Sequence, residues 1–162
     1  MGFCTKQSSF QKKIYCGIVA KEKNMASSLP SALMSPQIIN GVVEWYCNDS
    51  FTYVIQITLI NPITQDRVMV QPDDQIQVSF YAPGGKLVHT FVTKGVDLTL
   101  DEKTGSQNLT LDFTEEVSHK FVVFPQDRQT KYTKYTYCIK LIDINGIHTI
   151  GANLEAKVRA CH

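Results

Sequence analysis

The residues best suited to chemistry in this chain are five cysteines and four histidines. A thiol or hydroxyl beside an imidazole makes a nucleophilic site, and cysteine with histidine at short spacing binds zinc. Cys161 and His162 are adjacent, but no Cys-x-x-Cys or His-x-x-x-His spacing supplies the two further ligands that zinc needs. The chain also has no nucleophile elbow, glycine-rich phosphate loop or metal-binding helix motif. We therefore expect no catalytic residue, no metal, no cofactor and no enzymatic activity.

Two cysteines, Cys47 and Cys138, lie in apolar segments with alternating patterns. Two interpretations stay open for them, because a disulfide and a pair of buried thiols both suit such surroundings. The odd number of cysteines argues only against a fully paired disulfide framework.

An acidic turn, Asp143-Ile144-Asn145-Gly146, is similar to a fragment of a calcium-binding loop. Its glycine comes too early for such a loop, and no bidentate glutamate follows. Asn-Gly is a strong hairpin signal, so we interpret this segment as a β-turn.

Aromatic side chains offer a different chemistry, because exposed rings stack on sugars. Trp45, Tyr46 and Tyr132 are the candidate aromatic platform. These rings support an alternative function, that of a carbohydrate- or surface-binding β-sandwich module. The tyrosines that alternate after Tyr132 share one face of a strand, which favours core packing or a subunit contact for them.

The composition limits the classes of protein that these residues can serve. The chain has 162 residues, 43% of them hydrophobic and 19% charged, with a net charge of +1. Those values exclude a disordered chain, a coiled coil and a protein that binds nucleic acid by bulk charge. No apolar run approaches the roughly 20 residues of a membrane span. We expect one folded domain that binds neither nucleic acid nor membrane.

The first 24 residues differ from the rest in charge. They carry five lysines and one acid, whereas the remainder carries 11 basic and 14 acidic residues. Lys21-Glu22-Lys23-Asn24-Met25 back-translates to codons that can contain a bacterial ribosome-binding site just before Met25. We interpret 1–24 as a basic segment that is either disordered or untranslated upstream sequence read as protein by mistake, and we expect Met25 to be the native start. A signal peptide and a basic arm are the other interpretations.

Residues 25–37 are small and polar, contain two prolines, and predict an extended N-terminal arm. Such an arm can become ordered when it docks on a partner. The candidate interface residues are Leu29, Pro30, Leu33, Met34 and Ile38.

Residues 38–162 alternate between apolar and polar side chains in short segments. Turn signals recur about every 8–12 residues, which is typical of an antiparallel β-sandwich. Strands are expected at 42–47, 51–59, 67–70, 75–80, 86–93, 96–100, 108–113, 132–142, 147–150 and 154–159. Thr114 is expected to cap one short helical turn that begins with Glu115 and Glu116.

The order of these elements resembles a known family. The segment from Gln75 to Val88 is a strand, a Pro-Gly turn and a strand; a β pair and a short turn over 115–121 follow. A tyrosine-rich strand from Tyr135, an Asn-Gly turn and a return strand to Ile150 complete the pattern. This is similar to the N-terminal immunoglobulin-like domain of phage baseplate upper proteins and to related small tail or baseplate proteins of phages of Gram-positive bacteria. The resemblance covers about Val42 to Val158.

The resemblance implies an immunoglobulin-like β-sandwich without catalytic residues. It implies a structural or assembly role in the virion of a phage or prophage, in the tail or baseplate, after synthesis in the bacterial cytoplasm. The partners would be other copies of the chain, in a homo-oligomer, and other virion structural proteins.

Overall fold

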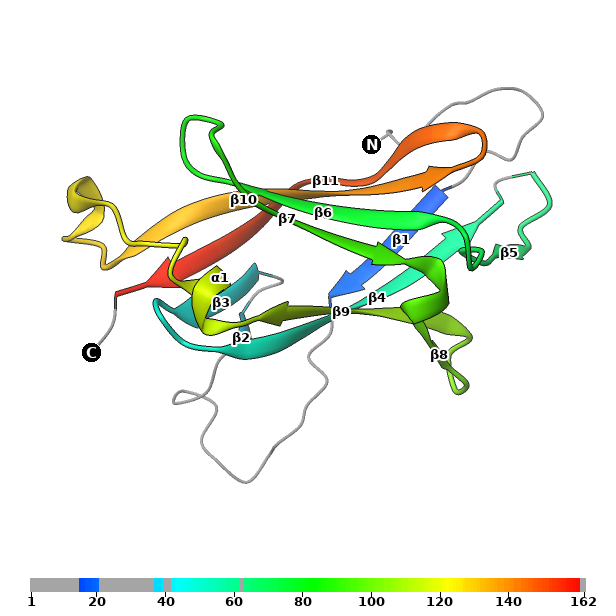
Figure 1. Cartoon of the computed structure of the whole chain (residues 1–162), viewed down its shortest axis with the longest axis horizontal. Coiled ribbons are helices and arrows are strands. Elements are labelled where there is room, and N and C mark those ends of the chain that lie inside the picture. The colour runs from blue at the N-terminus through cyan, green and yellow to red at the C-terminus, as the bar shows by residue number, and fades with distance from the viewer. Residues whose placement is uncertain (1–14, 21–36, 40–41, 62, 161–162) are drawn as a thin grey trace.

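The computed structural model of this protein describes residues 15–20, 37–39, 42–61 and 63–160, and for 15–20 and 37–39 it describes the backbone alone. Most of the described chain is β-strand, which confirms the all-β fold class expected from the sequence. Two curved sheets face each other (Figure 1). Among the described residues the one α-helix is α1, a single turn over Glu115–Ser118, and the short 3-10 helices η2 and η3 cover Gly95–Asp97 and Pro125–Asp127.

The first sheet is built around β4, the longest of its strands. Its order is β1 (Tyr15–Ala20), β4 (Phe51–Ile60), β9 (Ser106–Phe113) and β8 (Thr99–Asp101), and β5 (Arg67–Val68) pairs with the end of β4. All of these pairings are antiparallel.

The second sheet has six strands. Their order is β2 (Gln37–Ile39), β3 (Val42–Tyr46), β11 (Gly146–Arg159), β10 (Tyr132–Asp143), β6 (Gln75–Tyr81) and β7 (Leu87–Lys94). One pair departs from the expected antiparallel pattern, because β3 and β11 run parallel, from Val43 opposite Ala156 to Tyr46 opposite Arg159. These strands come from opposite ends of the domain, so no tight turn imposes an antiparallel direction on them.

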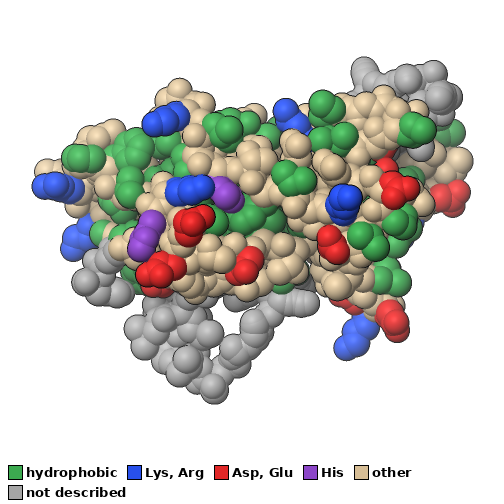
Figure 2. All heavy atoms as spheres, in the orientation of Figure 1, with side chains coloured by type: hydrophobic (Ala, Val, Ile, Leu, Met, Phe, Trp, Pro, Cys, Tyr) green, Lys and Arg blue, Asp and Glu red, His purple; other side chains and the backbone are tan. Residues whose placement is uncertain are grey.

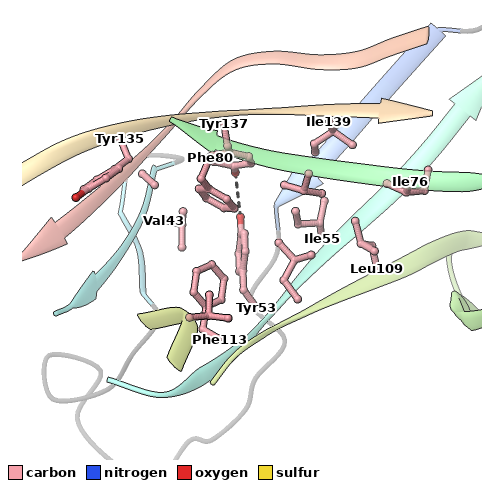
Figure 3. Packing of buried hydrophobic residues seen from close by; sticks show 14 of the residues in the cluster. Val43, Tyr53, Ile55, Ile76, Phe80, Leu109, Phe113, Tyr135, Tyr137 and Ile139 are labelled. Carbon is pink, nitrogen blue, oxygen red and sulfur yellow. Dashed lines mark hydrogen bonds between the residues drawn. The ribbon is translucent and has the colours of Figure 1, made fainter. Parts of the chain in front are cut away.

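The core lies between the sheets and follows the period-2 pattern of the strands. In β4, alternate side chains from Phe51 to Leu59 are buried, while those between them are exposed or half-buried. Tyr53 of the first sheet and Tyr137 of the second point toward each other, with 3.5 Å between their hydroxyl oxygens (Figure 3). Contact between side chains from both layers is the packing expected of a sandwich.

The predicted turns and the helix cap are confirmed. In the β6–β7 hairpin, Gly84 and Gly85 both have positive φ, at 94° and 89°, which glycine adopts without a steric penalty. Asn145 lies in the turn that leads into β11, as expected, and Gly146, the first residue of β11, has a φ of 130°. The Thr114 hydroxyl accepts a hydrogen bond of 3.3 Å from the Val117 amide, so Thr114 is the N-cap of α1.

Two strand predictions were wrong in detail. The strand expected at 96–100 begins as η2 and becomes β8 only at Thr99, because the chain crosses from the second sheet to the first there. The two strands expected at 147–150 and 154–159 form the single strand β11, in which pairing with β10 shifts register between Tyr137 and Lys140. A β-bulge of this kind absorbs an irregular stretch without ending the strand.

The N-terminal predictions meet the structure only in part. Tyr15–Ala20 of the basic segment forms β1, paired with β4 from Tyr15 opposite Ile60 to Ala20 opposite Ile55. The start at Met25 stays a prediction. Of the expected arm, Gln37 belongs to β2 and the rest lies outside the described residues. No helix in the described part of the chain is long and apolar enough to span a membrane.

Candidate interaction surface

Trp45, the first residue of the expected aromatic platform, lies in the core instead. Its side chain is 2% exposed, and its ring centroid is 5.2 Å from that of Phe51 and 5.1 Å from that of Phe113. Trp45 alternates with Glu44 along β3, so it points toward the first sheet while Glu44 points away. The expectation that Trp45 forms part of a surface platform was therefore wrong, because the opposing sheet covers its ring.

The other two platform residues, Tyr46 and Tyr132, are half-buried. Two cations lie over the Tyr132 ring, with Lys157 Nζ at 4.8 Å and Arg159 Cζ at 5.6 Å from its centroid. Arg159 Nε also donates a hydrogen bond of 2.7 Å to a carboxylate oxygen of Glu44, whose side chain is buried. The Tyr132 ring is thus one part of a charged cluster that joins β3, β10 and β11.

The expected interface residues cannot be placed. Leu29, Pro30, Leu33 and Met34 lie outside the described residues. Ile38 lies in β2, where it is opposite Val43 of β3. The role of these five residues stays a prediction.

The structure distinguishes the two cysteines whose pairing was left open. Cys138 is a half-buried free thiol on β10. Cys47, the residue after β3, is disulfide-bonded. A Cys47–Cys138 disulfide is therefore absent, and the alternative of two buried free thiols is wrong for Cys47.

His148 belongs to a local contact. His148 Nε2 is 3.0 Å from a carboxylate oxygen of Asp143, across the β10–β11 hairpin. The same oxygen accepts a hydrogen bond of 2.7 Å from the Asn145 amide. This arrangement stabilises the turn that the sequence predicted. Among the described residues, cysteine, histidine, aspartate and glutamate form no group of three or more that could hold a metal ion.

The most distinctive surface of the described molecule is the outer edge of β7. Among the described strands, β7 pairs with β6 alone, so the backbone groups that point away from β6 have no strand partner. Large apolar side chains are exposed along this margin: Leu87 and Val92 on β7, Val96 on η2 and Leu100 on β8. We call the outer backbone of β7 together with these four side chains the β7 edge.

Figure 2 looks onto this side of the molecule. Hydrophobic side chains are exposed over much of this face, including the region of η2 and β8, and lysine and acidic side chains lie among them both near α1 and near β8. The exposed fractions of Val92, Val96 and Leu100 are 56%, 63% and 54%, so their apolar surface is open to solvent. Apolar side chains grouped beside an open strand are typical of a contact surface.

Charge does not protect the middle of this edge. Proteins commonly place lysine, other inward-pointing charges or bulges on edge strands to prevent association. Lys86 precedes the strand and Lys94 is its last residue, but the seven residues between them include no aspartate, glutamate, lysine or arginine. The register shift between β6 and β7 leaves Val88 of β7 without an opposite residue in β6, so β7 has a bulge near its start, whereas the pairing from His89 to Lys94 is regular.

His89 is the one ionisable side chain within this stretch. Burial lowers its pKa, and the nearby Lys120 ammonium lowers it further, whereas Glu116 raises it. Lys120 Nζ lies 3.2 Å from His89 Nδ1, a distance at which the ammonium donates to a neutral imidazole. His89 is thus held in its uncharged form, and it adds no charge that would repel a neighbouring strand.

Aromatic contacts hold the edge in place. The Phe91 ring centroid is 5.0 Å from that of Phe113 on β9 and 6.0 Å from that of Phe80 on β6. His89 meets Phe91 edge-on at 4.6 Å. These contacts attach β7 to both sheets, so a partner would meet a strand that is already formed, at a small cost in conformational entropy.

The sequence predicted β7 as a strand but not its place at the edge of a sheet. Alternation shows which residues share a face, whereas an edge is defined by the strand that is missing beside it. The uncharged run between Lys86 and Lys94 was the one signal available.

Comparison of the chain with protein-family models and with curated proteins found no match.

Proposed function

We propose that this chain is a non-enzymatic structural protein that acts through protein–protein contacts, as a tail or baseplate component of a phage or prophage virion. The observation that supports contact as its mode of action is the β7 edge, a preformed strand with an unpaired outer backbone and exposed apolar side chains. The virion assignment rests on the resemblance described above.

An open edge strand serves assembly because its backbone is a ready template. A strand from another molecule gains main-chain hydrogen bonds along the edge, and side chains on alternate positions supply specificity. In this proposal the partners are other copies of the chain and other virion structural proteins. The chain is made in the bacterial cytoplasm and works in the particle.

The alternative of a carbohydrate-binding module has less support. Trp45 is enclosed by phenylalanine rings of both sheets, and cations of β11 lie over the Tyr132 ring. A sugar-binding platform needs aromatic faces open to solvent.

The test is whether the chain is part of purified particles. Density-gradient-purified phage or induced prophage from the source strain is digested and analysed by quantitative mass spectrometry against the known tail proteins of the same particle. We expect peptides of this chain in a fixed, multiple copy number per particle. Chain that stays in the soluble host fraction and is missing from the particles would refute the proposal.

A further inference from the structure

Two copies of the β7 edge can meet only in a limited number of ways. When antiparallel strands join in one sheet, opposite residues point to the same side of that sheet. A twofold axis perpendicular to the sheet must therefore place one residue of β7 opposite the same residue of the second copy. The central candidates are Thr90, Phe91 and Val92, because the pairing of β7 with β6 is regular around them.

Charge eliminates one of these registers. With Thr90 at the centre, Lys94 of each copy would lie opposite Lys86 of the other, and like charges directly opposite are destabilising. Length disfavours another. With Val92 at the centre, pairing would be limited to 90–94, since the chain leaves the strand at η2 after Lys94.

The register with Phe91 at the centre satisfies both requirements. Residues 88–94 of each copy, with the bulge residue Val88 at one end and a regular stretch from His89 to Lys94, face one another over about 24 Å. Phe91 lies opposite Phe91, Thr90 opposite Val92, and His89 opposite Thr93, which are aromatic and β-branched pairs that favour cross-strand contact. His89 is held neutral, so it adds no repulsion.

In the same register the ends of the strand carry charges of both signs, and Lys86 is no longer directly opposite Lys94. Lys86 lies two residues before the paired stretch, and Asp97 lies three residues after it. Antiparallel pairing brings Lys86 of each copy to the end where the other copy carries Asp97. The exposed side chain of Val96 lies beside Asp97 and extends the apolar contact at each end.

We infer that the β7 edge binds a second copy of this chain, with the two β7 strands antiparallel about a twofold axis at Phe91, so that their six-stranded sheets become continuous. This inference rests on the proposed function, because it names the partner that an assembly protein of this kind would take. The occupant is a second copy because one register pairs the apolar edge with itself and brings Lys86 of each copy to the end where the other copy carries Asp97.

The first test is the association of the full-length chain, measured by sedimentation velocity over a range of concentrations. We expect the wild type to form a dimer, and Val92→Lys to raise the dimer dissociation constant about tenfold or more, because it places an ammonium at the contact. Ile147→Lys is the matched control: Ile147 is an exposed aliphatic residue of the same sheet, on β11, and is 66% exposed. The unfolding temperature of each variant reports whether the fold is kept.

Two results would overturn the inference. One is a wild type that stays monomeric at the highest soluble concentration. The other is a Val92→Lys chain that is folded and associates as the wild type does, which would assign the contact to another surface, such as the 25–36 segment or an edge of the first sheet.

The second test concerns the register. Thr90→Cys and Val92→Cys are made separately in a Cys138→Ser background, and the two chains are mixed and mildly oxidised. Non-reducing electrophoresis should show more disulfide-linked dimer in the mixture than in either chain alone or in the background, because Thr90 faces Val92 of the other copy. Preferential linking of Thr90→Cys to itself would overturn the Phe91-centred register.

Failure of this inference can be told apart from failure of the proposed function. Edge pairing would be refuted, and the structural role left intact, by either of two results. In one, the chain is found in particles but is monomeric in solution; in the other, particles incorporate Val92→Lys normally. A Val92-dependent dimer that never enters the particles would support edge pairing and refute the virion role.

Discussion

The hydroxyl of Tyr135 makes the clearest quantitative prediction about this fold. The side chain is buried in β10, and its oxygen donates a hydrogen bond of 2.7 Å to the Val122 carbonyl. The same oxygen accepts a hydrogen bond of 2.9 Å from the Val122 amide. One hydroxyl therefore holds the segment between α1 and η3 against the second sheet. Tyr135→Phe removes both bonds and nothing else.

The size of the effect follows from these two bonds. A buried hydrogen bond contributes about 1 kcal/mol net, so we expect the free energy of unfolding to fall by about 2 kcal/mol. For a chain of this length that lowers the unfolding temperature by about 4–8 °C. Ring packing is unchanged, since Phe121 lies 5.2 Å from the ring centroid and a phenyl group fills the same space.

Tyr137→Phe is the matched control, because it removes the same atom from another buried tyrosine of the same strand. The Tyr137 hydroxyl lies 3.5 Å from that of Tyr53, too long for a strong hydrogen bond. We expect a loss below about 1 kcal/mol, and the double variant Tyr53→Phe/Tyr137→Phe to cost little more, because both polar groups are then gone.

Urea unfolding followed by tryptophan fluorescence measures the three variants, with calorimetry as a second probe. Trp45 lies in the core and reports the loss of packing directly. The reasoning would be refuted if Tyr137→Phe destabilised the protein as much as Tyr135→Phe, since the two differ in bonding and hardly in burial.

Three further predictions test other parts of the structure. Gly95→Ala should lower the free energy of unfolding, measured by urea titration, by roughly 3 kcal/mol, because the new Cβ would lie 1.9 Å from the Gln71 carbonyl oxygen. A loss under about 1 kcal/mol would contradict this close approach. The pKa of His89 is lowered in the folded chain, so below pH ~6.5 the unfolded chain binds a proton that the folded chain does not. The free energy of unfolding of the wild type should therefore fall below pH ~6.5 relative to that of His89→Gln. If the two proteins lose stability in parallel as the pH falls, His89 is not the cause. Burial raises the pKa of Tyr53, Tyr135 and Tyr137. The free energy of unfolding should therefore fall above pH ~10, because the unfolded chain releases these protons at a lower pH than the folded chain. Ultraviolet absorbance titration should show these three phenols ionising only as the chain unfolds.

Local features of the fold were predictable because they depend on neighbours in the sequence. Asn145-Gly146 makes a hairpin through its own backbone preferences, and Thr114 caps α1 through an amide three residues away. The strand at 96–100 was predicted wrongly because alternation continues through η2, and only the close approach of Gly95 to Gln71 shows that the chain turns there.

The candidate surface was less accessible to sequence reasoning. Trp45 has the residue type of a surface platform, and its burial depends on Phe51, Phe113 and the opposing sheet. The Glu44–Arg159 ion pair joins residues 115 positions apart, through a parallel pairing that no turn signal announces. The β7 edge was not predicted either, because it exists only where no further strand pairs with β7, and strand pairing depends on segments far apart in the sequence.

The all-β class, the positions of most strands and turns, and the side chains that share a face of each strand could all be predicted from the order of the residues. Period-2 alternation and turn chemistry act over a few residues, so they can be read directly. The face that became core, the strands that became neighbours and the strand left at an edge are visible only in the folded molecule. Those outcomes depend on contacts between distant segments, such as Phe91 with Phe113 or Tyr53 with Tyr137, whose free energy is gained only when the whole sandwich assembles.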